Sequence, residues 1–104
     1  MKVAVYIRFG NRPETISFEK ALAERRLREY AEQHNYQICD EVVEFASAQG
    51  GLPKLKQLLN RSPTDVQGVL CLSPSTVCRH PIMMPLWEHR ARRHNKNFFF
   101  AERP

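Results

Sequence analysis

The sequence predicts an α/β domain of three layers, with a mostly parallel central sheet of about four strands flanked by helices. Two observations predict this fold class. Short apolar runs, rich in β-branched or aromatic residues, alternate along the chain with longer amphipathic segments. The segments between successive strands are also long enough for the crossovers that parallel pairing requires. Such an alternation of strand and helix is typical of a parallel sheet with helices on its faces.

The first half of the chain is expected to form a strand, a helix and a second strand. Residues 2–8 are predicted to form a buried strand, because five consecutive apolar residues precede Arg8. Residues 14–34 are predicted to form a long helix that ends at Asn35, since asparagine tolerates the left-handed conformation. The second strand is predicted over residues 36–43. The helix has one apolar stripe, formed by Phe18, Leu22, Ala23, Leu27, Tyr30 and Ala31.

The second half repeats this alternation. Pro53 is expected in the first turn of a short helix, where its missing N–H costs little. Pro81 and Pro85 fit only the N-terminal region of the last helix. On that helix, Trp87 and its apolar neighbours Leu86 and Met83 are spaced like core residues. The expected elements are a polar loop over 44–51, a helix over 52–60, a strand over 66–72, a helix over about 81–94 and a strand over 98–100.

Length and composition indicate one globular domain, residues 1–104. With 42% hydrophobic and 26% charged residues, the chain does not have a disordered composition. No apolar run approaches the ~20 residues that a membrane span needs, and no signal peptide is evident, so we expect a cytoplasmic protein without a membrane partner.

The three cysteines predict no disulfide framework, and Cys39 and Cys71 are expected to be buried because they lie in apolar runs.

The formal charge of +5 is concentrated towards the end of the chain, where six Lys or Arg but only two Glu follow from Arg79 onward. This asymmetry permits an anionic partner such as nucleic acid, although a solubilising face is the alternative. Neither a metal nor a cofactor is expected. The residues that might have suggested a metal match no zinc spacing; they are Cys78, His80, His89 and His94.

Several segments carry a family resemblance. Tyr6-Ile7-Arg8-Phe9-Gly10 resembles the Tyr-x-Arg-x-Ser segment that opens the catalytic domain of serine recombinases, the resolvases and invertases. Residues 52–59 resemble the Arg-Pro-x-Leu-x-x-Leu-Leu helix start of that family. Residues 27–38 and 65–80 are similar to further family segments, so the resemblance spans nearly the whole chain. It implies a resolvase-like fold, with the family's long helix and C-terminal DNA-binding domain absent.

In that family a serine attacks a DNA phosphate, and arginines gathered around the phosphate stabilise its negative charge. Position by position, the resemblance keeps Arg8 and Arg79 as the first and last arginines of this cluster. The nucleophile position is Gly10, which has no side chain. The remaining positions have also lost the family's residue type; they are Leu52 for arginine, Ser73 for lysine, Ser75 for aspartate, Thr76 for arginine and Ala23 for glutamine.

The resemblance therefore predicts a degenerate recombinase-like domain with no catalytic residue. Its expected role is that of a non-catalytic regulatory or interaction module linked to DNA recombination or mobile elements. The alternatives are a small phosphate- or nucleotide-binding protein that reuses the same crevice, and a decayed remnant. A displaced nucleophile, Ser47, Ser73 or Ser75, has no histidine or lysine beside it in sequence to activate it.

Arg8 and Arg79 are the candidates for a residual phosphate or DNA site; the alternative is an ordinary ion pair or a position in solvent for each. Expected partners are a protein, either an intact recombinase or a second copy of this chain, and DNA bound weakly or without sequence preference. Direct protein contact is favoured over DNA contact. The weaker DNA-binding candidates are the basic residues of the last helix and its end, namely Arg90, Arg92, Arg93 and Lys96.

Overall fold

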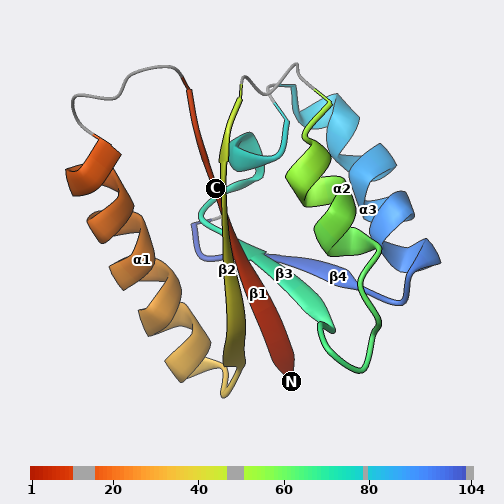
Figure 1. Ribbon diagram of the computed structural model, residues 1–104, viewed down its shortest axis with the longest axis horizontal. Helices are drawn as coiled ribbons and strands as arrows, with labels where there is room; N and C mark the ends of the chain where they lie inside the picture. Colours follow the sequence, from red (N-terminus) through yellow and green to blue (C-terminus); the bar gives the residue numbers. More distant parts are fainter. Residues whose placement is uncertain (11–15, 47–50, 79, 103–104) are drawn as a thin grey trace.

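A computed structural model describes residues 1–10, 16–46, 51–78 and 80–102. It confirms the predicted three-layer α/β fold: one sheet lies between α1 on one face and α2 and α3 on the other (Figure 1). The elements in chain order are β1 (Lys2–Phe9), α1 (Ile16–Gln33), β2 (Gln37–Phe45), α2 (Pro53–Leu59), β3 (Gly68–Cys71), the short 3-10 helices η2 (Pro74–Thr76) and η3 (Pro81–Met83), α3 (Met84–Arg93) and β4 (Asn97–Phe100).

The sheet has four strands in the order β2-β1-β3-β4, and all of its pairings are parallel. β1 lies in the interior of the sheet, with Val3 opposite Ile38 of β2 and Gly68 of β3. Its side chains alternate between the two helical layers: Val5 packs in the core under α1, and Tyr6 packs in the core under α2 and α3. Burial on both faces explains why β1 reads as a continuous apolar run.

Each helical layer contributes a short set of small or branched apolar side chains to the core. α1 ends where the sequence predicts, and Asn35 has the left-handed φ of 57° that such an end favours. The N-terminal half of α1 differs from the expectation, since Phe18 is 69% exposed and Leu22 is 49% exposed. The buried contacts of α1 come from Ala23, Leu27 and Ala31, and those of α2 come from Leu55, Leu58 and Leu59.

The last helix also departs from the prediction. A 3-10 turn precedes α3, which begins only at Met84 with Pro85 in its first turn. Met83 and Leu86, both expected in the core, are 44% and 61% exposed. Trp87 alone of the three packs against the core, and it is only partly buried. Helical spacing placed the three together, but the face of α3 that meets the sheet is carried by Met84 and Ala91.

Two predictions about β2 were wrong. The strand continues to Phe45 instead of ending at residue 43. Cys39 is exposed, not buried. The register between β1 and β2 shifts between Val3 and Ala4, so that no residue of β1 lies opposite Cys39, whose thiol donates to the Val3 carbonyl oxygen at 3.3 Å. An extra residue in one strand turns side chains away from their expected face, which explains the exposure of Cys39. Cys71 is buried as expected.

Candidate functional site at the carboxyl edge of the sheet

A cavity lies where the carboxyl ends of β1 and β3 meet, and its volume is about 530 Å³. Because the chain runs to opposite sides of β1 to form β2 and β3, this edge is the position at which parallel α/β sheets bind ligands. The lining residues come from the end of β1, from α1 and from the loops after β3 and β4; they are Tyr6, Ile7, Arg8, Phe9, Glu19, Leu22, Ala23, Arg26, Leu72, Thr76 and Glu102.

Arg8 is bound to three backbone carbonyl groups. Its Nε donates to the Thr76 oxygen at 2.7 Å, Nη1 donates to the Ala46 oxygen at 3.0 Å, and Nη2 donates to the Ser75 oxygen at 3.0 Å. These bonds join the end of β1 to the residue after β2 and to the turn η2. Within the described contacts, Arg8 thus has neither the carboxylate partner nor the purely solvated position that sequence reasoning had offered as alternatives to a phosphate site.

Gly10, which the resemblance assigns to the nucleophile position, is exposed. A Cβ added to it would meet no atom within 4 Å, and its φ is not positive. A serine would therefore fit here without strain. The lack of a hydroxyl group at this position is a property of the sequence and is not imposed by the backbone.

Among the described residues, the other positions that the resemblance assigns bring no cation to the cavity. Leu52 is fully buried in the core under α2 and α3, and its backbone is left-handed, with φ 48°. The hydroxyl groups of Ser73 and Ser75 bond to each other at 2.7 Å. Two of the sequence-predicted residues, Arg79 and Ser47, lie outside the described residues.

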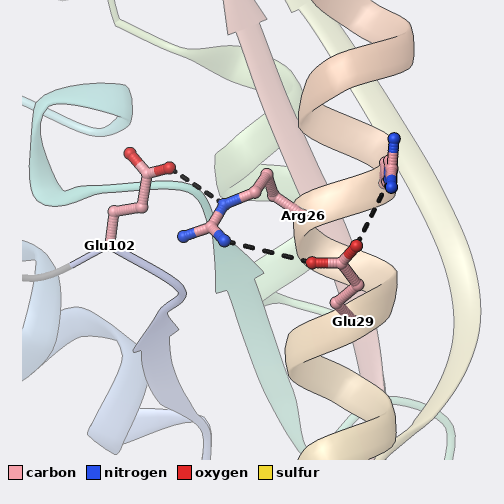
Figure 2. Close-up of polar contacts among 4 residues, drawn as sticks. Arg26, Glu29 and Glu102 are labelled. Atoms are coloured by element: carbon pink, nitrogen blue, oxygen red, sulfur yellow. Dashed lines mark hydrogen bonds and ion pairs between the residues drawn. The ribbon is translucent and has the colours of Figure 1, made fainter.

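Charges at the cavity mouth are compensated. Arg26 of α1 lies between Glu29 of the same helix and Glu102, which follows β4 (Figure 2). Its Nε is 3.1 Å from Glu102 Oε1, and its Nη1 is 3.9 Å from Glu29 Oε2. Among the described lining residues, Arg8 and Arg26 are matched in number by Glu19 and Glu102. The described lining of the cavity is therefore balanced in formal charge.

Sequence reasoning missed Glu44, which it placed in a polar loop. Glu44 is only 4% exposed. The Tyr6 hydroxyl group donates a hydrogen bond to Glu44 Oε1, with 2.6 Å between the two oxygens. The same carboxylate accepts the backbone N–H groups of Lys54 at 3.0 Å and Leu55 at 3.3 Å, at the start of α2. Burial, followed by the bond to Glu44, raises the pKa of Tyr6. No local pattern reveals this contact, because Tyr6 and Glu44 are 38 residues apart.

The basic residues near the chain end divide into two kinds. Arg90, Arg92 and Arg93 are exposed on α3, and the Arg90 guanidinium lies 5.1 Å from the centre of the Trp87 ring. Lys96 is fully buried, and its Nζ donates to the Arg61 carbonyl oxygen. Burial and the nearby charge of Arg61 lower the Lys96 pKa. Lys96 is therefore not part of the exposed basic surface.

Two further findings concern the described part of the chain alone. Within it, no group of three or more His, Cys, Asp or Glu side chains is arranged to hold a metal ion. Nor does any helix there combine the length and the apolar character that crossing a bilayer requires.

The parallel sheet with helices on both faces makes this an α/β protein, and its cavity lies at the carboxyl edge of β1. The sequence matches no protein-family model and no curated protein. Among solved structures, it is similar to the C-terminal catalytic domain of ISC1926 TnpA, an IS607-like serine recombinase, with a TM-score of 0.80, 15% identity, and coverage of 97% of this chain and 70% of that chain.

Two other catalytic domains are similar over nearly all of this chain. For the C-terminal domain of IS1535 TnpA, also an IS607-like serine recombinase, the TM-score is 0.77 at 19% identity, covering 98% of this chain and 71% of that one. For the N-terminal domain of TP901-1 integrase, the TM-score is 0.74 at 21% identity, covering 97% and 77%. The chain thus has the fold of a serine recombinase catalytic domain.

Proposed function

We propose that this chain is a serine recombinase-like domain that does not cleave DNA and acts as a regulatory or interaction module in DNA recombination, in the setting of a mobile element. The observation that carries the proposal is Gly10: it occupies the nucleophile position at an open, exposed site, where a serine would fit. The names of the similar structures, a transposon protein and an integrase among them, support the link to recombination.

The chemistry of the family's reaction explains why a hydroxyl group at this position is necessary, though not sufficient, for cleavage. Strand cleavage requires a hydroxyl oxygen to attack phosphorus while the deoxyribose oxygen leaves, so that a phosphoserine ester forms as the DNA ester breaks. Glycine supplies no such oxygen. Loss of fixed cations at Leu52 and Thr76 removes further stabilisation of the transition state, worth about 3 kcal/mol per donor at comparable anionic sites.

A displaced nucleophile is not favoured. Ser73 and Ser75 bond to each other, and no histidine or lysine side chain contacts either hydroxyl among the described contacts. Without a general base, a serine hydroxyl is a weak nucleophile at neutral pH. A phosphate- or nucleotide-binding role is also less favoured, because acidic and basic residues are balanced in number within the described lining of the cavity.

A protein partner is supported by the exposed apolar side chains. Phe18 and Leu22 are exposed on α1, and Ile82 and Leu86 are exposed at η3 and α3. Phe18 and Leu22, four residues apart, share one face of α1, and adjoining exposed apolar groups are typical of contacts between proteins. An intact serine recombinase and a second copy of this chain are the two partners proposed.

Two experiments test the two parts of the proposal. Incubation with nicked suicide duplexes is expected to give no covalent protein–DNA adduct. Addition of the purified domain to a strand-exchange reaction of an intact serine recombinase is expected to change its rate. A strand-exchange rate that stays constant at every ratio of domain to recombinase would contradict the regulatory role. A covalent protein–DNA adduct would contradict the proposal that the domain does not cleave DNA.

A further inference from the structure

The positive charges of the two helical layers differ in their surroundings. On α1, Lys20 lies 3.7 Å from Glu24, Arg25 lies 3.3 Å from Glu29, and Arg26 is paired with Glu102. On the opposite face of the sheet, the exposed cations of α2 and α3 include Lys56, Arg90 and Arg93, and none of these has an ion pair within the described ranges. The charge on this face is therefore available to an anionic partner.

These cations line a groove between α2 and α3, which we call the α2–α3 groove. It consists of two adjoining hollows of about 310 and 200 Å³ that share Lys56 and Arg90. No acidic residue is among the described residues that line either hollow. The basic hollow is lined by Lys56, Asn60, Arg90, Arg93 and His94, and the other by Gly51, Lys56, Met83, Leu86, Trp87 and Arg90.

The sequence spacing places the polar groups of the groove in two rows. Lys56 and Asn60 are four residues apart across the end of α2, and Arg90 and Arg93 are three residues apart on α3. Residues at these spacings lie on the same face of a helix, about one turn of 5.4 Å apart. Arg92 is exposed on the same helix but does not line the groove.

Both rows are carried by elements that the core holds in place. Leu55 and Leu59 of α2 are fully buried, as is Ala91 of α3. Trp87 packs against this core, and the Arg90 guanidinium lies over its ring. A cation held over an aromatic face loses less side-chain freedom when it binds a ligand. The groove thus presents its cations in a partly preorganised arrangement.

We propose that the α2–α3 groove binds the phosphate backbone of duplex DNA, weakly and without sequence preference. Arginine favours phosphate because its planar fork matches two oxygens of the anion, and the Asn60 amide offers a further donor. Lys56 on α2 and two arginines about one turn apart on α3 suit the closely repeated charges of a duplex, and the apolar end of the groove can contact uncharged deoxyribose. This inference rests on the proposed link to DNA, but it does not depend on whether the chain cleaves DNA. The residues that line the groove are different from those that line the cavity at Arg8.

The test compares two charge-matched double variants of the whole chain. Arg90→Gln with Arg93→Gln removes two charges from the groove, and Arg28→Gln with Lys2→Gln removes two exposed charges outside it. Fluorescence anisotropy with a labelled duplex of about 20 bp, titrated from about 20 to 200 mM NaCl, gives the affinity and its salt slope. Circular dichroism melting confirms that both variants fold.

The groove variant is expected to bind at least about tenfold more weakly at low salt, with a salt slope smaller by about two, whereas the control variant changes affinity by less than about threefold. Equal losses in both variants, or no duplex binding by the unmodified chain at low salt, would overturn the groove assignment. So would a poly-glutamate peptide that binds the groove more tightly than DNA at equal charge. Covalent trapping remains a separate readout, so a failure here leaves the non-cleaving proposal standing, and the reverse also holds.

Discussion

Arg8 Nε donates a hydrogen bond to the Thr76 carbonyl oxygen at 2.7 Å, and this bond joins the end of β1 to the turn after β3. Two further bonds from the same guanidinium reach Ala46 and Ser75. Three loops at the carboxyl edge of the sheet are thus held by a single side chain. The arginine that the resemblance assigns to phosphate binding therefore contributes to the folded structure of this chain.

Replacement of Arg8 by lysine should destabilise the fold. An ammonium group is compact and cannot reach three carbonyl groups arranged around a planar fork. Hydrogen bonds from a charged donor contribute about 1.5–3 kcal/mol each, and lysine can recover part of this, so we expect a loss of roughly 1–3 kcal/mol in the free energy of unfolding. Urea denaturation measures the difference. Arg28→Lys on the exposed face of α1 is the control and should stay within about 0.5 kcal/mol. An equally small effect at Arg8 would contradict its structural role.

The Tyr6–Glu44 bond should show strong coupling in a double-mutant cycle. Glu44→Gln leaves one acceptor oxygen where three donors converge, so a loss of about 2–3 kcal/mol is expected. Tyr6→Phe removes only the hydroxyl and should cost about 1–2 kcal/mol. Because the two residues share a bond, the combined variant should lose less than the sum, by at least about 0.5 kcal/mol. Additive losses would show that the buried bond does not form.

Alkaline pH should weaken the fold through two buried groups. Burial raises the pKa of both Tyr6 and Cys71 in the folded state. The unfolded chain therefore loses these protons first, near pH 8.5 for the thiol and near pH 10 for the phenol, and stability falls as the pH rises above these values. Melting temperatures measured in reducing buffer from about pH 7 to 11 should decline accordingly. Tyr6→Phe should flatten the decline above about pH 10 and leave the part near pH 9 unchanged; an identical profile would refute the assignment to Tyr6.

Two glycines offer a matched pair for testing the packing of the sheet. A Cβ at Gly68 of β3 would lie 2.5 Å from Cε2 of Phe99, whereas one at Gly10 would meet nothing within 4 Å. Gly68→Ala forces the Phe99 ring to move and should cost about 1–3 kcal/mol. Gly10→Ala should change the free energy of unfolding by less than about 0.5 kcal/mol. Similar values for the two variants would mean that β3 and β4 pack differently.

The sequence was informative where structure follows from local periodicity. The apolar run of β1, the stripe of α1 and the stop at Asn35 each express a backbone preference or a buried face, and together they predicted the fold. Cys39 was misplaced because a one-residue register shift is set by pairing with β1 and leaves no sequence signal. Lys96 was misplaced because a basic residue in a basic run predicts a solvated position, while its actual partner is the Arg61 carbonyl oxygen.

The candidate site was predicted only in part. The predicted first strand placed Arg8 and Gly10 near the carboxyl end of β1, and Arg8 lines the cavity there, whereas the roles that the resemblance assigns to them stay predictions. The carbonyl partners of Arg8 and the burial of Leu52 follow from loop conformations that the sequence does not specify. Glu44 and the α2–α3 groove were missed for the same reason: each is assembled from residues of separate elements.

Covalent trapping tests the central claim most directly. Three proteins are compared: the unmodified chain, the Gly10→Ser variant and an intact serine recombinase. Each is incubated with a labelled pool of nicked suicide duplexes whose central base-pair step is randomised, and the products are resolved under denaturing conditions. The intact recombinase should give a labelled protein band. The unmodified chain should give none, and Gly10→Ser should also give none, because a restored hydroxyl still lacks the cations lost at Leu52 and Thr76. A labelled adduct of the unmodified chain, mapped to any of its serines, would contradict the account.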